Sequence, residues 1–144
     1  MKDLEKIITS FGVQEELNPK IWDNSDDAPK SHMKLEVKNQ LDEIAEEFIR
    51  DNNAIPGFLG LYDFPNTLCM SPNAQVVHGI PNDKPLVEGD IISIDCGAFK
   101  NGFYGDHAYT FEVGKVDEQT KKLLEVTKQS LYEGIRQFKT GNRV

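Results

Sequence analysis

The dipeptide Asn101-Gly102 and the two β-prone stretches beside it constrain the fold of this chain more than any other feature. Residues Ile91–Ala98 are rich in β-branched side chains, and Phe103–Val113 continues as an extended stretch after the turn. Asn-Gly between two such stretches is typical of the two-residue turn of a β-hairpin. Shorter patterns at Leu68–Ser71 and Gln75–His78 predict further extended segments. We therefore expect an antiparallel sheet in this part of the chain.

Helical patterns lie on both sides of the predicted sheet. Between Lys34 and Arg50 the apolar residues fall on one stripe of an amphipathic helix, at Leu41, Ile44, Ala45, Phe48 and Ile49. Asp117 is placed to cap a second helix, whose apolar face precedes Gly141 and comprises Thr120, Leu123, Leu124, Thr127, Leu131, Ile135 and Phe138. The expected fold class is α+β, with one antiparallel sheet and two main helices.

The first forty residues differ in character from the rest of the chain. A short helical pattern covers residues 4–11, and turn-forming residues follow over 17–31. Residues 1–53 carry 7 basic and 13 acidic side chains, whereas residues 54–144 carry 9 and 11. We interpret residues 1–40 as an acidic appendage of helix and loop, and residues 41–144 as the main domain.

Composition narrows the possible classes of function. The chain has 144 residues, a formal charge of −8 and a pI near 4.8. This balance argues against nucleic acid and anionic membranes as partners, because binding phosphates takes clustered Lys and Arg. No stretch approaches the roughly 18 apolar residues of a membrane span, and the N-terminus is not signal-like, so we expect a cytoplasmic protein. Cys69 and Cys96 form no CxxC motif, and we expect both to be reduced thiols.

Two aspartates of the predicted hairpin are the strongest candidates for chemistry. Asp95 lies in a stretch that should be a buried strand, where an ionised carboxylate needs compensation. Asp106 lies in the facing strand, and a two-residue turn at Lys100-Asn101 or Asn101-Gly102 puts both aspartates on the same sheet face. Two close carboxylates repel unless they share a proton or bind a cation. The pattern leaves three interpretations: a shared-proton pair, two metal ligands, or two separate carboxylates that accept backbone hydrogen bonds.

Other candidates have structural interpretations beside the functional ones. His78 follows two valines, and a lone histidine in that position is more often a hydrogen-bonded residue at a strand end than a catalyst. Cys69 fits a small core position, since no adjacent basic residue would lower the pKa of its thiol. The loop over residues 54–65 carries three aromatic residues that fit either the core or an apolar pocket, Phe58, Tyr62 and Phe64.

Several motifs in a fixed order resemble a known family. They are Leu41-Asp42-Glu43-Ile44-Ala45-Glu46-Glu47-Phe48-Ile49, Ala54-Ile55-Pro56, Asn73 with Val76-Val77-His78-Gly79-Ile80-Pro81, Gly89-Asp90-Ile91-Ile92-Ser93-Ile94-Asp95, and Gly105-Asp106-His107-Ala108-Tyr109-Thr110-Phe111. Through them, residues 41–144 are similar to the N-terminal half of a bacterial type I methionine aminopeptidase, a metalloprotease. The resemblance implies half of a pita-bread fold, in which two similar halves surround a metal site.

The same resemblance implies a role for each candidate residue. Asp95 and Asp106 match two metal ligands, and His78 matches the histidine that contacts the scissile peptide. Thr110 would support the ligands without binding the metal itself. The pocket for the methionine side chain would be lined by Phe58, Tyr62, Phe64 and Cys69. The implied cofactor is a divalent ion, Mn, Fe or Co, and the implied substrate is the N-terminus of a peptide.

The chain also departs from this family, and the departures shape the expected function. The family's second half supplies a histidine, two glutamates and a second catalytic histidine, and this chain reaches Val144 where that half would begin. We therefore expect weak or absent metal binding and little or no aminopeptidase turnover by such a fragment. The alternative is a non-catalytic chimeric scaffold in which residues 1–40 come from another protein. An exposed half-fold face would favour a homodimer.

Overall fold

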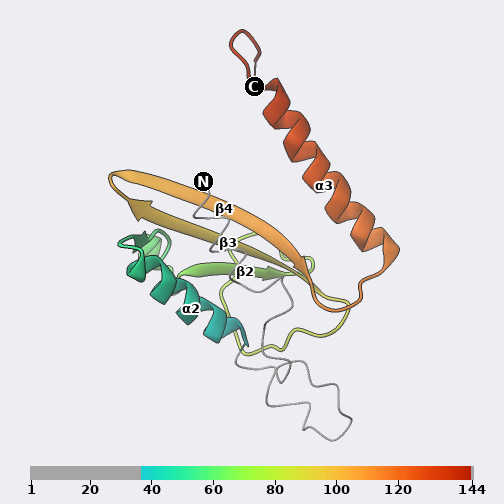
Figure 1. The fold of residues 1–144 in the computed structure, drawn as a ribbon. Coiled ribbons are helices and arrows are strands. Elements are labelled where there is room, and N and C mark those ends of the chain that lie inside the picture. The colour runs from blue at the N-terminus through green and yellow to red at the C-terminus, as the bar shows by residue number, and fades with distance from the viewer. Residues whose placement is uncertain (1–36, 144) are drawn as a thin grey trace, which may run out of the picture.

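A four-stranded antiparallel sheet lies at the centre of the structure, a computed structural model that describes residues 37–143 (Figure 1). The elements along the chain are α2 (Val37–Asp51), β1 (Ile55–Pro56), the short 3-10 helix η2 (Leu61–Asp63), β2 (Leu68–Pro72), β3 (Ile91–Lys100), β4 (Phe103–Glu112) and α3 (Glu118–Gln137). The predicted α+β fold with two main helices is confirmed. The predictions for residues 4–11 and 17–31, and most of the appendage at 1–40, lie outside the described residues.

The hairpin forms around the predicted turn. Lys100 pairs with Phe103, so the loop between β3 and β4 is the dipeptide Asn101-Gly102. Both loop residues have positive φ, 53° and 84°, which is the backbone conformation that Asn-Gly adopts readily in a hairpin turn. β3 pairs along its whole length with β4 on one edge, and with β1 and β2 on the other. β3 is therefore the central strand, and its side chains alternate between the two faces of the sheet.

Helix α2 covers one face of the sheet and forms the core with it (Figure 1). The buried residues of this core are Ala45, Ile49, Leu68, Met70, Ile92 and Cys96. Full burial of each large apolar side chain contributes about 1.5–3 kcal/mol. Burial also raises the pKa of the Cys96 thiol to about 12, so that this free cysteine stays protonated. Ile44 belongs to the predicted apolar stripe but is 53% exposed, so the packed stripe is narrower than the sequence predicts.

A buried carboxylate joins α2 to the start of β2. Asp42 is 8% exposed, and its Oδ1 accepts a hydrogen bond of 2.7 Å from the Leu68 backbone N–H. Its Oδ2 accepts from the Thr67 backbone N–H at 3.2 Å and from the Asn66 side-chain amide at 3.0 Å. Asp42 thus satisfies donors that the sheet leaves unpaired where β2 begins.

The predicted extended segment at Gln75–His78 is wrong, because the chain turns after β2 instead of continuing as a strand. Asn73 has a φ of 51°, and its side chain accepts from the Ile91 backbone N–H at 3.1 Å and donates to Asp90 at 2.9 Å. These contacts stabilise a left-handed turn at Asn73. The segment that follows is a loop, and His78 lies in it with a φ of 58°.

Helix α3 begins at the predicted cap and projects away from the sheet (Figure 1). The Asp117 side chain accepts from the Thr120 backbone N–H at 2.7 Å, and the helix ends at Gln137, four residues before Gly141. No α3 side chain is buried in the part of the chain that the structure describes. The apolar side chains that are most exposed on α3 and at its C-cap are Leu123, Leu131, Ile135 and Phe138. Over residues 37–143, neither helix is long and apolar enough to cross a membrane.

Candidate metal centre

The hairpin register places Asp95 and Asp106 on the same face of the sheet. Asp95 pairs with Ala108, and Asp106 pairs with Gly97. Paired residues on neighbouring antiparallel strands point to the same side, and so do residues two apart on one strand. The two aspartates are therefore diagonal neighbours on the face opposite to α2. This is the arrangement that a two-residue turn at Asn101-Gly102 predicts.

The two carboxylates interact strongly. Burial, the charge of Asp106 and a hydrogen bond shared with Asp106 together raise the pKa of Asp95 to about 6, with burial as the largest cause. The charge of His78 and the Cys96 backbone N–H act in the opposite direction. One oxygen of Asp95, Oδ1, is buried and has no hydrogen-bond partner among the described residues. A buried acceptor without a donor beside a second carboxylate suits a divalent cation, which binds carboxylate oxygens.

The ligand set is nevertheless small. Within residues 37–143, no group of three or more His, Cys, Asp and Glu side chains is placed to hold a metal ion. Two carboxylates leave most positions around a divalent ion to water or to ligands from elsewhere. The described residues therefore fit one part of a metal site rather than a complete one.

Cys69 and Thr110 lie on the same face as the aspartates. Cys69 pairs with Asp95, and burial together with the charges of Asp95 and Asp106 raises the pKa of its thiol to about 11. A protonated thiol is a poor metal ligand, so oxygen atoms dominate the chemistry of this face. Thr110 pairs with Ser93, and their hydroxyls are 2.7 Å apart. The Thr110 hydroxyl thus lies further along β4 and is engaged by Ser93.

Of the three loop aromatics, Phe58 reaches the face of the aspartates. A Cβ atom added to Gly97 would lie 2.5 Å from Cε1 of Phe58, so the ring covers Gly97 beside Asp106. Tyr62 is 96% exposed and its side chain points into solvent. Phe64 is half-buried and closes the short turn of η2 through its backbone N–H.

His78 lies on the outer side of β2. The next residue, Gly79, donates its N–H to Oγ of Ser71 at 3.0 Å and accepts from the Met70 N–H at 2.7 Å. The segment with His78 is thus attached to β2, which is itself paired with β3. Sequence reasoning did not identify Ser71 as important. Its partner is eight residues away across a turn, and nothing in the local pattern of β2 indicates that contact.

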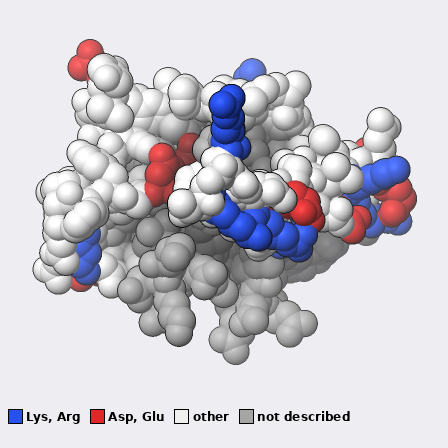
Figure 2. Space-filling view, turned by 90° about the horizontal axis from the view of Figure 1, so that it is seen from above, with Lys and Arg blue, Asp and Glu red and all other residues white. Residues whose placement is uncertain are grey.

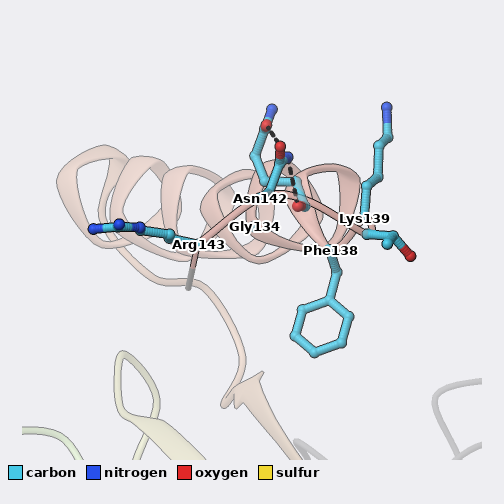
Figure 3. Close-up of a pocket in the computed structure, with 7 residues that line it drawn as sticks. Gly134, Phe138, Lys139, Asn142 and Arg143 are labelled. Atoms are coloured by element: carbon cyan, nitrogen blue, oxygen red, sulfur yellow. Dashed lines mark hydrogen bonds between the residues drawn. The ribbon is translucent and has the colours of Figure 1, made fainter.

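Two cavities among the described residues lie away from the aspartate pair. One of about 600 Å³ is at the C-terminal end of α3 (Figure 3), lined by Gly134, Gln137, Phe138, Lys139, Thr140, Asn142 and Arg143. Another, of about 220 Å³, lies near Lys38 and Asn82. The surface in Figure 2 mixes acidic, basic and uncharged side chains and has no continuous basic area on the face shown. The aspartate pair lines neither cavity.

Comparisons with known proteins identify the family of this chain. The profile of metallopeptidase family M24 matches residues 21–144. Methionine aminopeptidase 1 of Bacillus subtilis is 48% identical over 116 residues, which are 80% of this chain and 47% of that protein. Methionine aminopeptidase of Borreliella burgdorferi is 53% identical over 105 residues, 73% of this chain and 42% of that protein.

Solved structures of methionine aminopeptidases have a similar fold to this chain. The methionine aminopeptidase of Thermotoga maritima superposes with a TM-score of 0.68 at 37% identity, over 71% of this chain and 41% of that one. The enzyme of Rickettsia prowazekii gives 0.66 at 43% identity, over 68% and 40%. The chain spans less than half the length of these relatives. With a matching family profile over most of its residues and close relatives in sequence and fold, this chain belongs to metallopeptidase family M24.

Proposed function

We propose that this chain supplies Asp95 and Asp106 to the metal centre of a methionine aminopeptidase, an enzyme that hydrolyses the N-terminal methionine from peptides. The observation that carries the proposal is the aspartate pair on one sheet face, with a buried Asp95 oxygen that lacks a donor. The relatives in sequence and in fold described above are methionine aminopeptidases, which supports the same activity. A cytoplasmic location stays a prediction from the sequence.

Each candidate residue has a part in this proposal. Asp95 and Asp106 hold the divalent ion. Mn, Fe or Co suits their oxygen ligands, and the neighbouring thiol of Cys69 is protonated. When bound, the ion supplies the positive charge that polarises a peptide carbonyl and makes a water easier to deprotonate. His78 contacts the scissile peptide. Thr110 is hydrogen-bonded to Ser93 and thereby stiffens β4 next to the ligands, on the same face of the sheet.

An apolar surface beside the aspartates suits the methionine side chain. Phe58 is the strongest of the loop aromatics, because its ring already covers Gly97 on this face. Cys69 adds a neutral, polarisable sulfur next to Asp95. Tyr62 and Phe64 follow in the same loop and would form the rim of the pocket.

Residues 37–143 by themselves should be poor catalysts. Two carboxylates hold a divalent ion weakly and do not fix two metals or orient an attacking water. We therefore expect little or no release of methionine from a Met-Ala-Ser peptide unless further ligands are supplied. An active enzyme would need a partner polypeptide segment that provides those ligands.

Calorimetric titration with Mn²⁺ tests the proposal. We expect the original chain to bind Mn²⁺ weakly. In Asp95→Asn and in Asp106→Asn the affinity should fall at least about tenfold and the heat should be lost, because each substitution removes half of the ligand pair. Glu112→Gln is the matched control. Glu112 is an exposed carboxylate on β4 and on the same face, roughly 20 Å from Asp106 at about 3.4 Å per residue. A heat that survives both aspartate substitutions contradicts the proposal.

The second candidate is a non-catalytic scaffold that self-associates. It is favoured by the exposed apolar stripe of α3, which includes Leu123, Leu131 and Ile135. In a chimeric scaffold the aspartates would be a relic, and the Mn²⁺ heat would not depend on them. The α3 stripe would then pack in a homodimer of C₂ symmetry. Light scattering over a concentration series separates the two cases, since a monomer at every concentration eliminates the dimer.

A further inference from the structure

We propose that Ser71 is a positioning residue that holds His78 in its left-handed conformation beside the aspartate pair. The proposal rests on the proposed function for the role of His78. The attachment of the His78 segment to β2 stands on the geometry alone.

Two hydrogen bonds attach this segment to consecutive residues of β2. Ser71 is 3% exposed, and its Oγ accepts from the Gly79 N–H at 3.0 Å. The Gly79 carbonyl accepts from the Met70 N–H at 2.7 Å. A Cβ atom on Gly79 would overlap the Met70 carbonyl, so only glycine permits this close approach. Ser71 and Gly79 therefore form a buried contact, and any side chain at position 79 would push the two segments apart.

This contact stabilises an unfavourable backbone conformation at His78. A φ of 58° is rare for a residue with a side chain and persists only where the surroundings impose it. Residue 79 is fixed by Ser71 and Met70, and the other end of the loop is fixed at Asn73 by its bonds to Asp90 and Ile91. With both ends held, the short loop has little freedom, and His78 is kept in its left-handed conformation.

The position of Ser71 within the sheet explains why this affects the candidate site. Ser71 is two residues from Cys69 on β2, on the same face, and Cys69 pairs with Asp95. The backbone segments of His78, β2, β3 and β4 therefore lie side by side. The charge of His78 acts on Asp95, which agrees with this placement. Without the Ser71 hydroxyl, the buried Gly79 N–H would lose its acceptor, and the His78 segment would move away from β2.

Ser93 provides a matched control. It pairs with Ser71 across β2 and β3, so it is the same residue type on the same face. Its hydroxyl contacts Thr110, on the side away from the His78 segment. Ser93→Ala therefore removes a strand hydroxyl without removing the acceptor of Gly79.

Nuclear magnetic resonance on the 144-residue chain tests the proposal. In Ser71→Ala we expect the Gly79 amide to exchange with solvent at least about tenfold faster, because the buried bond that protects it is gone. The Cα and Cβ shifts of His78 should lose the signature of positive φ, and the broadening of its ring signals by added Mn²⁺ should fall. Ser93→Ala should keep all three properties, and the Mn²⁺ affinity of Ser71→Ala should stay within about twofold of the original chain.

The outcomes separate this inference from the proposed function. Ser71→Ala with unchanged His78 shifts and Gly79 exchange overturns the positioning role. If Ser71→Ala does not fold, Ser71→Cys keeps a side chain of similar size with sulfur as a weaker acceptor, and should change the Gly79 exchange rate and the His78 carbon shifts in the same direction. Unchanged values in Ser71→Cys would then overturn the positioning role. Absence of Mn²⁺ broadening in the original chain would count against the metal site, while the exchange rates and carbon shifts would still decide the role of Ser71.

Discussion

Replacing Asp42 by alanine is expected to lower the free energy of unfolding by about 4 kcal/mol, the largest effect of any single substitution considered for this chain. The change removes the acceptor of three hydrogen bonds, from Asn66, Thr67 and Leu68. The Thr67 and Leu68 amides would stay buried without a partner, and each such donor costs about 1–3 kcal/mol. Urea denaturation followed by circular dichroism measures the loss.

Two companion variants make this test specific. Glu43→Ala removes a carboxylate from the adjacent, exposed position of α2 and should change the free energy of unfolding by less than about 0.5 kcal/mol. Asp42→Asn keeps one acceptor oxygen and should fall between alanine and the original residue. If Asp42→Ala unfolds at the same urea concentration as Glu43→Ala, Asp42 does not join α2 to β2 in solution.

The role of Asp42 shows where prediction from the sequence ends. The apolar stripe of α2 could be predicted because it repeats within the helix itself. Asp42 interrupts that stripe with a polar residue, and such a position is normally exposed. Its partners are 24 to 26 residues away, so the reason for its burial exists only after β2 has docked on the helix.

The candidate site divides in the same way. The hairpin was predictable because Asn101-Gly102 determines its register locally, and the register places Asp95 and Asp106 on one face. The loop that carries His78 was not predictable. Its turn at Asn73 depends on contacts with residues 17 and 18 positions later, and alternation of side chains alone indicated a strand.

Replacing Asp95 by asparagine is expected to stabilise the metal-free chain at pH 7 and to remove part of its pH dependence. In the folded chain the pKa of Asp95 is raised from 3.8 to about 6, by burial first and by Asp106 second. The folded state therefore holds a proton on this group that the unfolded state releases above about pH 4. Stability is highest below that pH and falls as the pH rises to about 6, then levels off.

The size of this effect is modest because solvent reaches the half-exposed carboxylate. A shift of this size corresponds to about 3 kcal/mol without screening, and we expect about 1 kcal/mol after solvent screening. Urea denaturation in a chelator at pH 4, 5, 6 and 7 measures it, with Glu112→Gln as the control carboxylate on β4. Equal pH slopes for Asp95→Asn and the original chain would mean that the pKa of Asp95 is not raised in the folded chain, and thus that Asp95 is neither buried nor beside Asp106 in solution.

Repulsion between the two carboxylates fits either a pair that shares a proton or a pair of metal ligands. Adding metal distinguishes these two interpretations. An aspartate pair that only shares a proton gains nothing from Mn²⁺, and Asp95→Asn stays the more stable chain at pH 7. A ligand pair is stabilised by Mn²⁺ in the folded state, by about 1.4 kcal/mol when the ion is at roughly ten times its dissociation constant. The asparagine variant loses that gain because it lacks one of the two carboxylates. The order of stability should therefore reverse between chelator and excess Mn²⁺, and an order that never reverses rules out a metal site at Asp95 and Asp106.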